Sequence, residues 1–294
     1  MPAALEEGQI ALIGQVFEDF TNAFVALREG NQPSGDWELE WICAVSPDQI
    51  ELSRRLSIGL DICGFTAVDA SWVIEAVAEK NWLEESYKQF PPFEVGPFFI
   101  YGSHYEGDVP ADQMGLQIDA ATAFGTGEHG TTKGCLEFML RLKDEGACPW
   151  NVLDMGCGSG ILAIAAWKLW KTPILAVDIE EESVRVSKVH QDMNGVSDAG
   201  SAMTCLHGDG FDTGDVQAKK PFDLVIANIL AGPLIEMAAD CKAVADENGY
   251  VILSGMLVEQ AQSVRAAYEA QGIRFIDQID IGEWASLLLQ NAAA

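Results

Sequence analysis

The chain has 294 residues, of which 49% are hydrophobic, so it is long and apolar enough for one large globular domain or two unequal ones. Its 45 acidic and 17 basic residues give a net charge of −28, which disfavours direct nucleic-acid binding and fits either a basic partner or simple solubility. An acidic start, no apolar run of ~20 residues, and seven scattered cysteines without a C-x-x-C pair predict a cytoplasmic protein with no membrane contact, disulfide framework or metal site.

Residues 1–78 are expected to form a small α/β domain. Apolar residues at helical spacing between Ile10 and Leu27 predict a helix, and WELEWICAV alternates in the way a half-buried strand does. Ser46 and Pro47 are suited to start a second helix in SPDQIELSRRLSIGL. The next stretch, residues 79–118, contains FPPFEVGPFFIYGSHY, which has no helical period and predicts a linker with short strands.

Strands and amphipathic helices alternate through residues 119–294. A helix is predicted after HGTT, with Cys135, Leu136 and Met139 on one face. The predicted strands are NVLDM, ILAVDI, AMTCLHG, FDLVIAN and GYVILSG, and further helices are predicted over residues 161–170 and 181–193, the latter ending at Asn-Gly. This alternation predicts an α/β fold with a parallel sheet that is covered on both faces.

The stretch LDMGCGSGIL, residues 153–162, has three glycines at alternate positions within the first strand–turn–helix unit. Ligands of open α/β sheets bind at such turns. The spacing G-x-G-x-G differs from the dinucleotide pattern G-x-G-x-x-G, and Asp154 lies two residues before the first glycine, Gly156. A carboxylate there would repel a pyrophosphate but attract a cationic amino-acid group. The pattern therefore favours S-adenosylmethionine as the ligand.

A second carboxylate, Asp178, ends the next predicted strand. An acidic side chain at this point accepts hydrogen bonds from both ribose hydroxyls of a nucleoside. NAD and S-adenosylmethionine share these hydroxyls, so Asp178 alone does not distinguish them. Together with Asp154 and the strands that follow, it favours a methyltransferase over a dehydrogenase.

Three segments resemble the bacterial ribosomal protein L-eleven methyltransferases, which belong to the seven-strand class I methyltransferases. They are AFGTGEHGTT (123–132), VLDMGCGSGILAIAA (152–166) and VIANILAGPLIEMA (225–238). LSGMLVEQAQSV (253–264) adds a further strand and the helix after it, and with NWLEESYKQFPPFEVG the resemblance covers about residues 81–290. It implies a seven-strand Rossmann-like sheet in residues 119–294 and a substrate-recognition domain in residues 1–78. The family usually begins with a strand, whereas a helix is predicted first here, so the mode of substrate docking is left open.

The resemblance implies that Thr132, Gly156, Asp178 and Asn228 contact S-adenosylmethionine. The residue types agree, because Gly156 and Gly158 let a ligand approach the main chain. Thr132 lies at a predicted helix start, where its hydroxyl can either cap the helix or bind the carboxylate of the ligand.

The segment before Thr132 contains Phe124 and His129. A lone histidine is more often structural than catalytic, and we expect this of His129. His190 has no supporting context in the sequence.

Asn228 ends a predicted strand and is followed by Ile229 and Leu230. Methyltransferases of planar nitrogens have N-P-P-Y here, whose aromatic ring stacks on the acceptor, so its absence favours an aliphatic amine. The reaction is attack of a neutral amine on the sulfonium methyl, which needs positioning and desolvation, and no dedicated general base is evident.

We therefore expect an S-adenosylmethionine-dependent protein N-methyltransferase with Asn228 as its catalytic residue. It would modify lysine and N-terminal amines of a basic ribosomal protein, by resemblance the L-eleven protein. The same fold could instead methylate another protein or a small amine, or could bind S-adenosylmethionine in a non-catalytic assembly protein. The number of methyl groups, their positions, the processivity and the oligomeric state do not follow from the sequence.

Overall fold

The computed structural model describes residues 5–17, 21–28, 36–43, 45–65, 73–75, 91–119, 130–196 and 203–292. The chain divides into two compact units, Met1–Lys80 and Asn81–Ala294, and each has hydrophobic clusters of its own. Within the described ranges, none of the helices has the length and apolar character needed to span a bilayer.

The first unit packs two helices against a two-stranded antiparallel sheet. Its elements are α1 (Glu7–Gln15), β1 (Thr21–Arg28), β2 (Trp37–Cys43) and α2 (Gln49–Ile62). Apolar residues of both helices form one cluster with the inward-facing side chains of the sheet. In this cluster Phe17 and Phe24 both contact Trp41 of β2, with ring centroids 4.7 and 5.3 Å away.

The single helix predicted between Ile10 and Leu27 is wrong in its second half. Helix α1 ends at Gln15, and the segment TNAFVALR forms strand β1, in which Phe24 lies opposite Trp41. The inward-facing residues of this segment recur at every second position, so a period of two competes with the helical spacing of its apolar residues. Thr, Asn and Val are also weak helix formers, and pairing with β2 satisfies the backbone of the strand.

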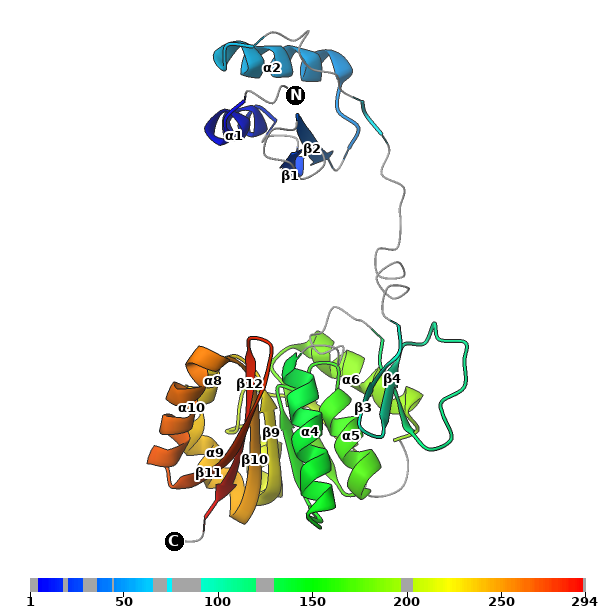
Figure 1. Cartoon of the computed structure of the whole chain (residues 1–294), viewed down its shortest axis with the longest axis vertical. Helices are drawn as coiled ribbons and strands as arrows, with labels where there is room; N and C mark the ends of the chain where they lie inside the picture. Colours follow the sequence, from blue (N-terminus) through cyan, green and yellow to red (C-terminus); the bar gives the residue numbers. More distant parts are fainter. Residues whose placement is uncertain are drawn as a thin grey trace. The chain divides into compact units, whose positions relative to one another are not determined.

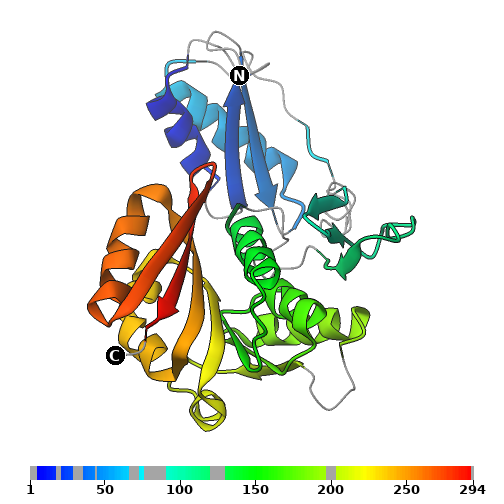
Figure 2. The ribbon, with the colours of Figure 1, turned by 60° about the horizontal axis from the view of Figure 1, so that its bottom comes forward.

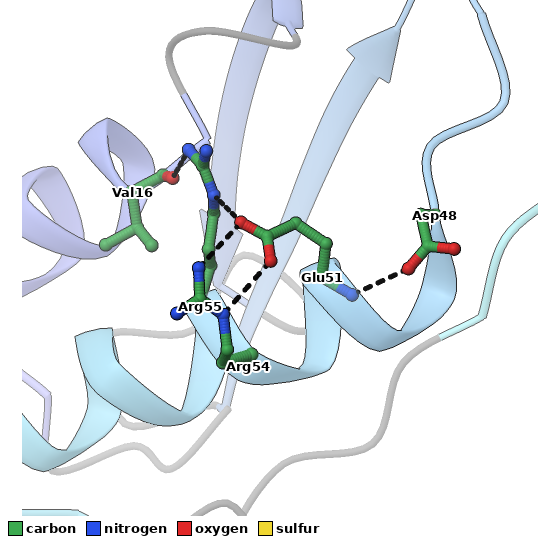
Figure 3. Close-up of polar contacts among 5 residues, drawn as sticks. All are labelled: Val16, Asp48, Glu51, Arg54 and Arg55. Atoms are coloured by element: carbon green, nitrogen blue, oxygen red, sulfur yellow. Dashed lines mark hydrogen bonds and ion pairs between the residues drawn. The ribbon is translucent and has the colours of Figure 1, made fainter.

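The predicted strand WELEWICAV and the helix after it are confirmed as β2 and α2. Asp48, rather than the serine two residues earlier, caps the helix, because its Oδ1 accepts a hydrogen bond from the Glu51 amide at 2.9 Å (Figure 3). The Glu51 carboxylate binds the guanidinium groups of Arg54 and Arg55, and Arg55 donates to the Val16 carbonyl at 3.1 Å. This chain of contacts joins the middle of α2 to the end of α1.

The second unit is built on a seven-stranded sheet. In sheet order the strands are β11 (Ile273–Ile281), β12 (Trp284–Asn291), β10 (Ala245–Leu257), β9 (Phe222–Asn228), β6 (Val152–Met155), β7 (Ile174–Asp178) and β8 (Met203–His207). Strands β10, β9, β6, β7 and β8 are parallel, and β12 is antiparallel to both of its neighbours. The expected seven-strand Rossmann-like sheet is therefore confirmed, and its strand order reverses at β6.

Helices cover both faces of this sheet (Figure 1). One layer contains α4 (Gly130–Asp144), α5 (Ile161–Trp170) and α6 (Glu181–Met193), and the other contains α8 (Ala231–Glu236), α9 (Ala238–Val244) and α10 (Val258–Ala270), while α7 (Gly214–Lys219) connects β8 to β9. A buried apolar cluster lies under each layer. Burial on both sides explains why the parallel strands are nearly continuous apolar runs.

Part of the stretch predicted as a linker with short strands forms a small three-stranded sheet, seen beside α4 and α5 in Figure 2. Its strands, in sheet order, are β3 (Phe93–Val95), β4 (Phe98–Tyr101) and β5 (Met114–Gln117). Phe98, Ile100 and Leu116 are buried in the same cluster as α4 and α5. These strands therefore pack as part of the second unit.

Candidate functional site

The carboxyl ends of three parallel strands meet at one edge of the main sheet. Strand β6 leads into the turn with Gly156 and Gly158, β7 ends at Asp178, and β9 ends at Asn228. Because β6 pairs with both β7 and β9, these ends are neighbours and lie where the strand order reverses. The first turn of α4 also reaches this edge, since the Thr132 hydroxyl lies 3.5 Å from Asn228 Nδ2. The predicted site residues, which come from four separate segments of the sequence, thus lie together at the carboxyl edge of the main sheet.

The turn after β6 requires its glycines. The backbone angle φ is +74° at Gly156, +53° at Gly158 and +80° at Gly160, a region that other residues rarely adopt. A Cβ on Gly156 would overlap the Ile229 side chain, and one on Gly160 would lie 2.7 Å from Ser187 Oγ. The turn therefore presents backbone at the carboxyl edge and packs closely against the segment after β9.

Asp178 holds the same turn from the end of β7. Its Oδ2 accepts a hydrogen bond from the Gly158 amide at 2.8 Å, and its Oδ1 accepts one from the Glu180 amide at 2.9 Å. These two bonds fix the carboxylate in one orientation. Each oxygen keeps a lone pair that can accept from a further donor, so the group is suited to bind a pair of hydroxyls.

Asp154 lies beneath the turn and is only 1% exposed. Its Oδ2 accepts from the Ala163 amide at 3.0 Å, in the first turn of α5, while its Oδ1 has no hydrogen-bond partner among the described residues. Burial raises the pKa of Asp154 to about 7, although the Ala163 hydrogen bond opposes this rise and the charge of Asp178 adds to it. Burial therefore favours the protonated form of this carboxyl group up to the neutral pH range.

Asn228 and Thr132 face each other at the end of β9. Asn228 Nδ2 donates a long hydrogen bond to the hydroxyl of Thr132, which is fully buried. The Oδ1 atom of Asn228 is buried and lacks a partner within the described part of the chain. An unpaired buried amide oxygen costs roughly 1–3 kcal/mol, so this atom is an acceptor available to a donor on a ligand.

Two residues of β10, Ser254 and Gly255, support this arrangement, although neither is among the residues predicted for the site. The Ile229 amide donates to the Ser254 carbonyl at 3.1 Å. Gly255 has φ +89°, and a Cβ there would overlap the Ile229 backbone. The buried Ser254 hydroxyl donates to the Thr131 carbonyl at 3.1 Å. The signal available in the sequence was LSG at the end of the predicted strand GYVILSG, and these residue types alone do not indicate such contacts.

His190 has a structural position that the sequence did not indicate. Its Nε2 accepts a hydrogen bond from the Asp119 amide at 3.1 Å, and its Nδ1 lies 2.7 Å from the Ser159 carbonyl oxygen. The two contacts fit a neutral ring with its proton on Nδ1, and burial lowers the pKa of His190. The ring thereby ties the glycine turn to the segment after β5.

Most of the segment AFGTGEHGTT precedes the first described residue of α4. Residues 123–129, with Phe124 and His129, lie outside the described residues. The predictions for those positions therefore stay predictions.

The described groups fit a small ligand that combines ribose hydroxyls with a cationic amino-acid part. A side chain at Gly156 would fill the space above the turn, and Asp178 offers two fixed acceptors. Asp154 has an oxygen beneath the turn with no partner in the part of the chain that the structure describes. Positive charge near Asp154 would stabilise its ionised form.

Comparison with known proteins gives a consistent result. The family model described as ribosomal protein L11 methyltransferase (PrmA) matches residues 32–292. The ribosomal protein L11 methyltransferase of Rhodopseudomonas palustris strain BisB5 is 40% identical over 278 residues, which cover 95% of this chain and 90% of that protein. The protein of the same description from Sinorhizobium fredii strain NBRC 101917 / NGR234 is 43% identical over 215 residues, 73% of this chain and 72% of that protein.

A solved structure is also similar. The crystal structure of a ribosomal protein L11 methylase from Lactobacillus delbrueckii subsp. bulgaricus has a TM-score of 0.61 and 28% sequence identity, and the match covers 69% of this chain and 100% of that one. The family match begins at residue 32 and so includes part of the first unit, which lies before the segments 81–290 whose motifs resemble the family.

Proposed function

The chain belongs to the ribosomal protein L11 methyltransferase family, and on this premise we propose that it methylates lysine and N-terminal amines of the L11 ribosomal protein. Membership makes it an S-adenosylmethionine-dependent protein methyltransferase. The observation that carries the finer proposal is Asn228 Oδ1, a buried acceptor without a partner among the described residues, at the strand end beside the glycine turn.

The cofactor is assigned to the turn and the strand ends around it. We assign the methionine part to Gly156 and Gly158, the ribose hydroxyls to Asp178, and the carboxylate to the first turn of α4 with Thr132. Asp154 is buried, so its contribution is to hold the turn through Ala163 and to supply negative charge behind it. When bound, S-adenosylmethionine supplies an electrophilic methyl group on a sulfonium.

Asn228 is assigned to the acceptor amine. Its Oδ1 accepts a hydrogen bond from the amine and so holds the lone pair of the nitrogen in line with the methyl group. Such positioning of the two reactants is expected to supply most of the rate enhancement. Lysine amines, with pKa ~10.4, and α-amines, with pKa ~8, must lose a proton before they attack, and desolvation lowers both values. The next residues, Ile229 and Leu230, are aliphatic, which favours an aliphatic amine over a planar nitrogen.

The partner is proposed to be a basic ribosomal protein, because a chain with a net charge of −28 attracts cationic surfaces and repels nucleic acid. We assign its recognition to residues 1–78. Since ribosomal proteins are made in the cytoplasm, we propose that the reaction takes place there.

The test is methyl transfer to recombinant L11 protein from the same organism. With isotope-labelled S-adenosylmethionine, the intact mass of L11 should rise by whole methyl groups, and peptide mapping should place the label on lysine and the N-terminal amine. The Asn228→Ala variant serves as the control for contaminating activity. Label on other proteins or small amines, with none on L11, would refute the proposed substrate.

A further inference from the structure

Ser254 contacts both segments that meet in the site. It is fully buried on β10 and pairs in register with Asn228 of β9. Its carbonyl oxygen accepts the Ile229 amide at 3.1 Å, just after Asn228, and its hydroxyl donates to the Thr131 carbonyl at 3.1 Å, just before Thr132. One residue therefore bridges the end of β9 and the first turn of α4.

The Ser254 hydroxyl lies within hydrogen-bond distance of three groups, one of which is a second buried serine. Ser254 Oγ lies 2.7 Å from Ser286 Oγ, 3.1 Å from the Thr131 carbonyl and 3.3 Å from the Ala285 carbonyl. A hydroxyl has one proton, so Ser254 can donate to one of these groups at a time. If Ser286 donates to Ser254, the Ser254 proton is left for Thr131, the nearer of the two carbonyls.

Helix α4 approaches these serines closely enough that small shifts matter. A Cβ on Gly134 would overlap Ser286 Oγ, so the first turns of α4 pack directly against this serine pair. Thr132 is the next residue after Thr131, so a shift of the first turn moves the Thr132 hydroxyl relative to Asn228. The long 3.5 Å contact between Thr132 and Asn228 does not by itself hold that separation.

We propose that Ser254 is a positioning residue for methyl transfer, which sets the separation of Thr132 and Asn228 by binding α4 on one side and the segment after β9 on the other. The proposal rests on the proposed function, in which Thr132 contacts the cofactor and Asn228 the acceptor. Ser254 itself touches neither reactant.

The matched pair Ser254→Ala and Ser286→Ala tests this. Each variant removes one hydroxyl from the same buried pair, but Ser286→Ala leaves Ser254 able to donate to Thr131. Ser254→Ala should weaken S-adenosylhomocysteine binding about 3- to 10-fold in calorimetry and lower kcat for L11 methylation about tenfold, with KM for L11 nearly unchanged. Ser286→Ala should stay within about twofold of the parent on each measure, while both variants lose similar thermal stability.

A double-mutant cycle separates positioning from general support. In a Thr132→Val background, Ser254→Ala should have little further effect on S-adenosylhomocysteine affinity, because its effect passes through Thr132. Ser254→Cys, similar in size with a weaker donor, should fall between the parent and Ser254→Ala, and it serves if the alanine variant does not fold.

Equal losses in the Ser254 and Ser286 variants, or an undiminished Ser254→Ala effect in the Thr132→Val background, would overturn the proposal. The affinity measurement needs no acceptor. A parent protein that binds S-adenosylhomocysteine but does not methylate L11 would therefore refute the proposed function, while the cycle still decides the role of Ser254.

Discussion

Asp154 links its own protonation to cofactor binding. Its pKa is raised to about 7, chiefly by burial, so a bound ligand with ammonium and sulfonium charges should shift the group to its ionised form. S-adenosylmethionine binding at about pH 7 should therefore release a fraction of a proton, measured by calorimetry in buffers of different ionisation enthalpy. The release should disappear in Asp154→Asn. A binding enthalpy of the parent that does not depend on the buffer would contradict this.

The same carboxyl group makes the stability of the free protein depend on pH. Its pKa of about 7 exceeds the ordinary value of 3.8, so the folded state binds more protons between these values and the contribution to stability falls as pH rises through that window. Asp154→Asn removes this loss. The free energy of unfolding of Asp154→Asn minus that of the parent should therefore be larger at about pH 8 than at about pH 4, by a few kcal/mol. Denaturant titrations of both proteins at the two pH values would show this. An unchanged difference would show that Asp154 does not titrate in this range.

Asn228 is expected to act through its carbonyl oxygen. Asn228→Ala should lower kcat by ~10²-fold or more, because the amine loses its orientation. Asn228→Asp keeps an acceptor but favours the protonated ammonium, which cannot attack, so its activity should be low at neutral pH and should recover in part as pH rises. The pH–rate profiles of both variants check this. Parent-like turnover in both would leave Asn228 as a strand terminus only.

At the level of elements, the sequence predicted the second unit well. Helices α5 and α6 begin and end at the predicted residues, and the five predicted strands correspond to β6, β7, β8, β9 and β10. Long apolar runs and well-marked ends leave little ambiguity in such segments. The first unit was harder, because the short apolar segment that forms β1 fits both periods and depends on its pairing with β2.

The candidate site was predictable where its residues end strands. Asp178 and Asn228 follow buried strands directly, and parallel strands bring such ends together. The contacts of Ser254 and Gly255 were not predictable, because they depend on the register of β10 against β9 and on the approach of α4, 123 positions away in the chain. Long-range contacts of this kind leave no periodic pattern in the sequence.

Gly255 gives a direct test of this packing. Its φ of +89° and the overlap of any Cβ with the Ile229 backbone mean that Gly255→Ala combines strain of ~1–3 kcal/mol with a steric clash. Its free energy of unfolding should fall by at least this amount in denaturant titrations. Gly214→Ala is the matched control, because a Cβ there meets nothing within 4 Å and Gly214 is the exposed first residue of helix α7 in the same unit, so its free energy of unfolding should stay within about 0.5 kcal/mol of the parent. Similar stabilities of the two variants would refute the close packing around Ile229.

On the scale of the whole molecule, part of the small positive charge is neutralised by nearby carboxylates. Among the described residues, five arginines form ion pairs with carboxylates. Arg54, Arg55, Arg185 and Arg265 pair within their own helices, and Arg141 pairs with Glu145 and Asp277. Such exposed pairs add little to stability, at ~0–1 kcal/mol each. Each pair cancels one positive and one negative charge, so the net charge of −28 from 45 acidic and 17 basic residues is unchanged. This net charge produces a negative electrostatic field around the protein.

This acidity should govern the encounter with a basic protein substrate. If the net charge of −28 attracts L11, kcat/KM for L11 should fall as salt rises over the range in which the Debye length shrinks from ~10 to ~3 Å. S-adenosylmethionine affinity should change much less, because its contacts lie in a partly buried site where screening is weak. Steady-state kinetics across a salt series, with calorimetry of the cofactor at the same salt concentrations, measures both. A flat profile for L11 would mean that the acidity serves solubility alone, and parallel losses of kcat/KM and cofactor affinity would place the salt effect in the site rather than in the encounter.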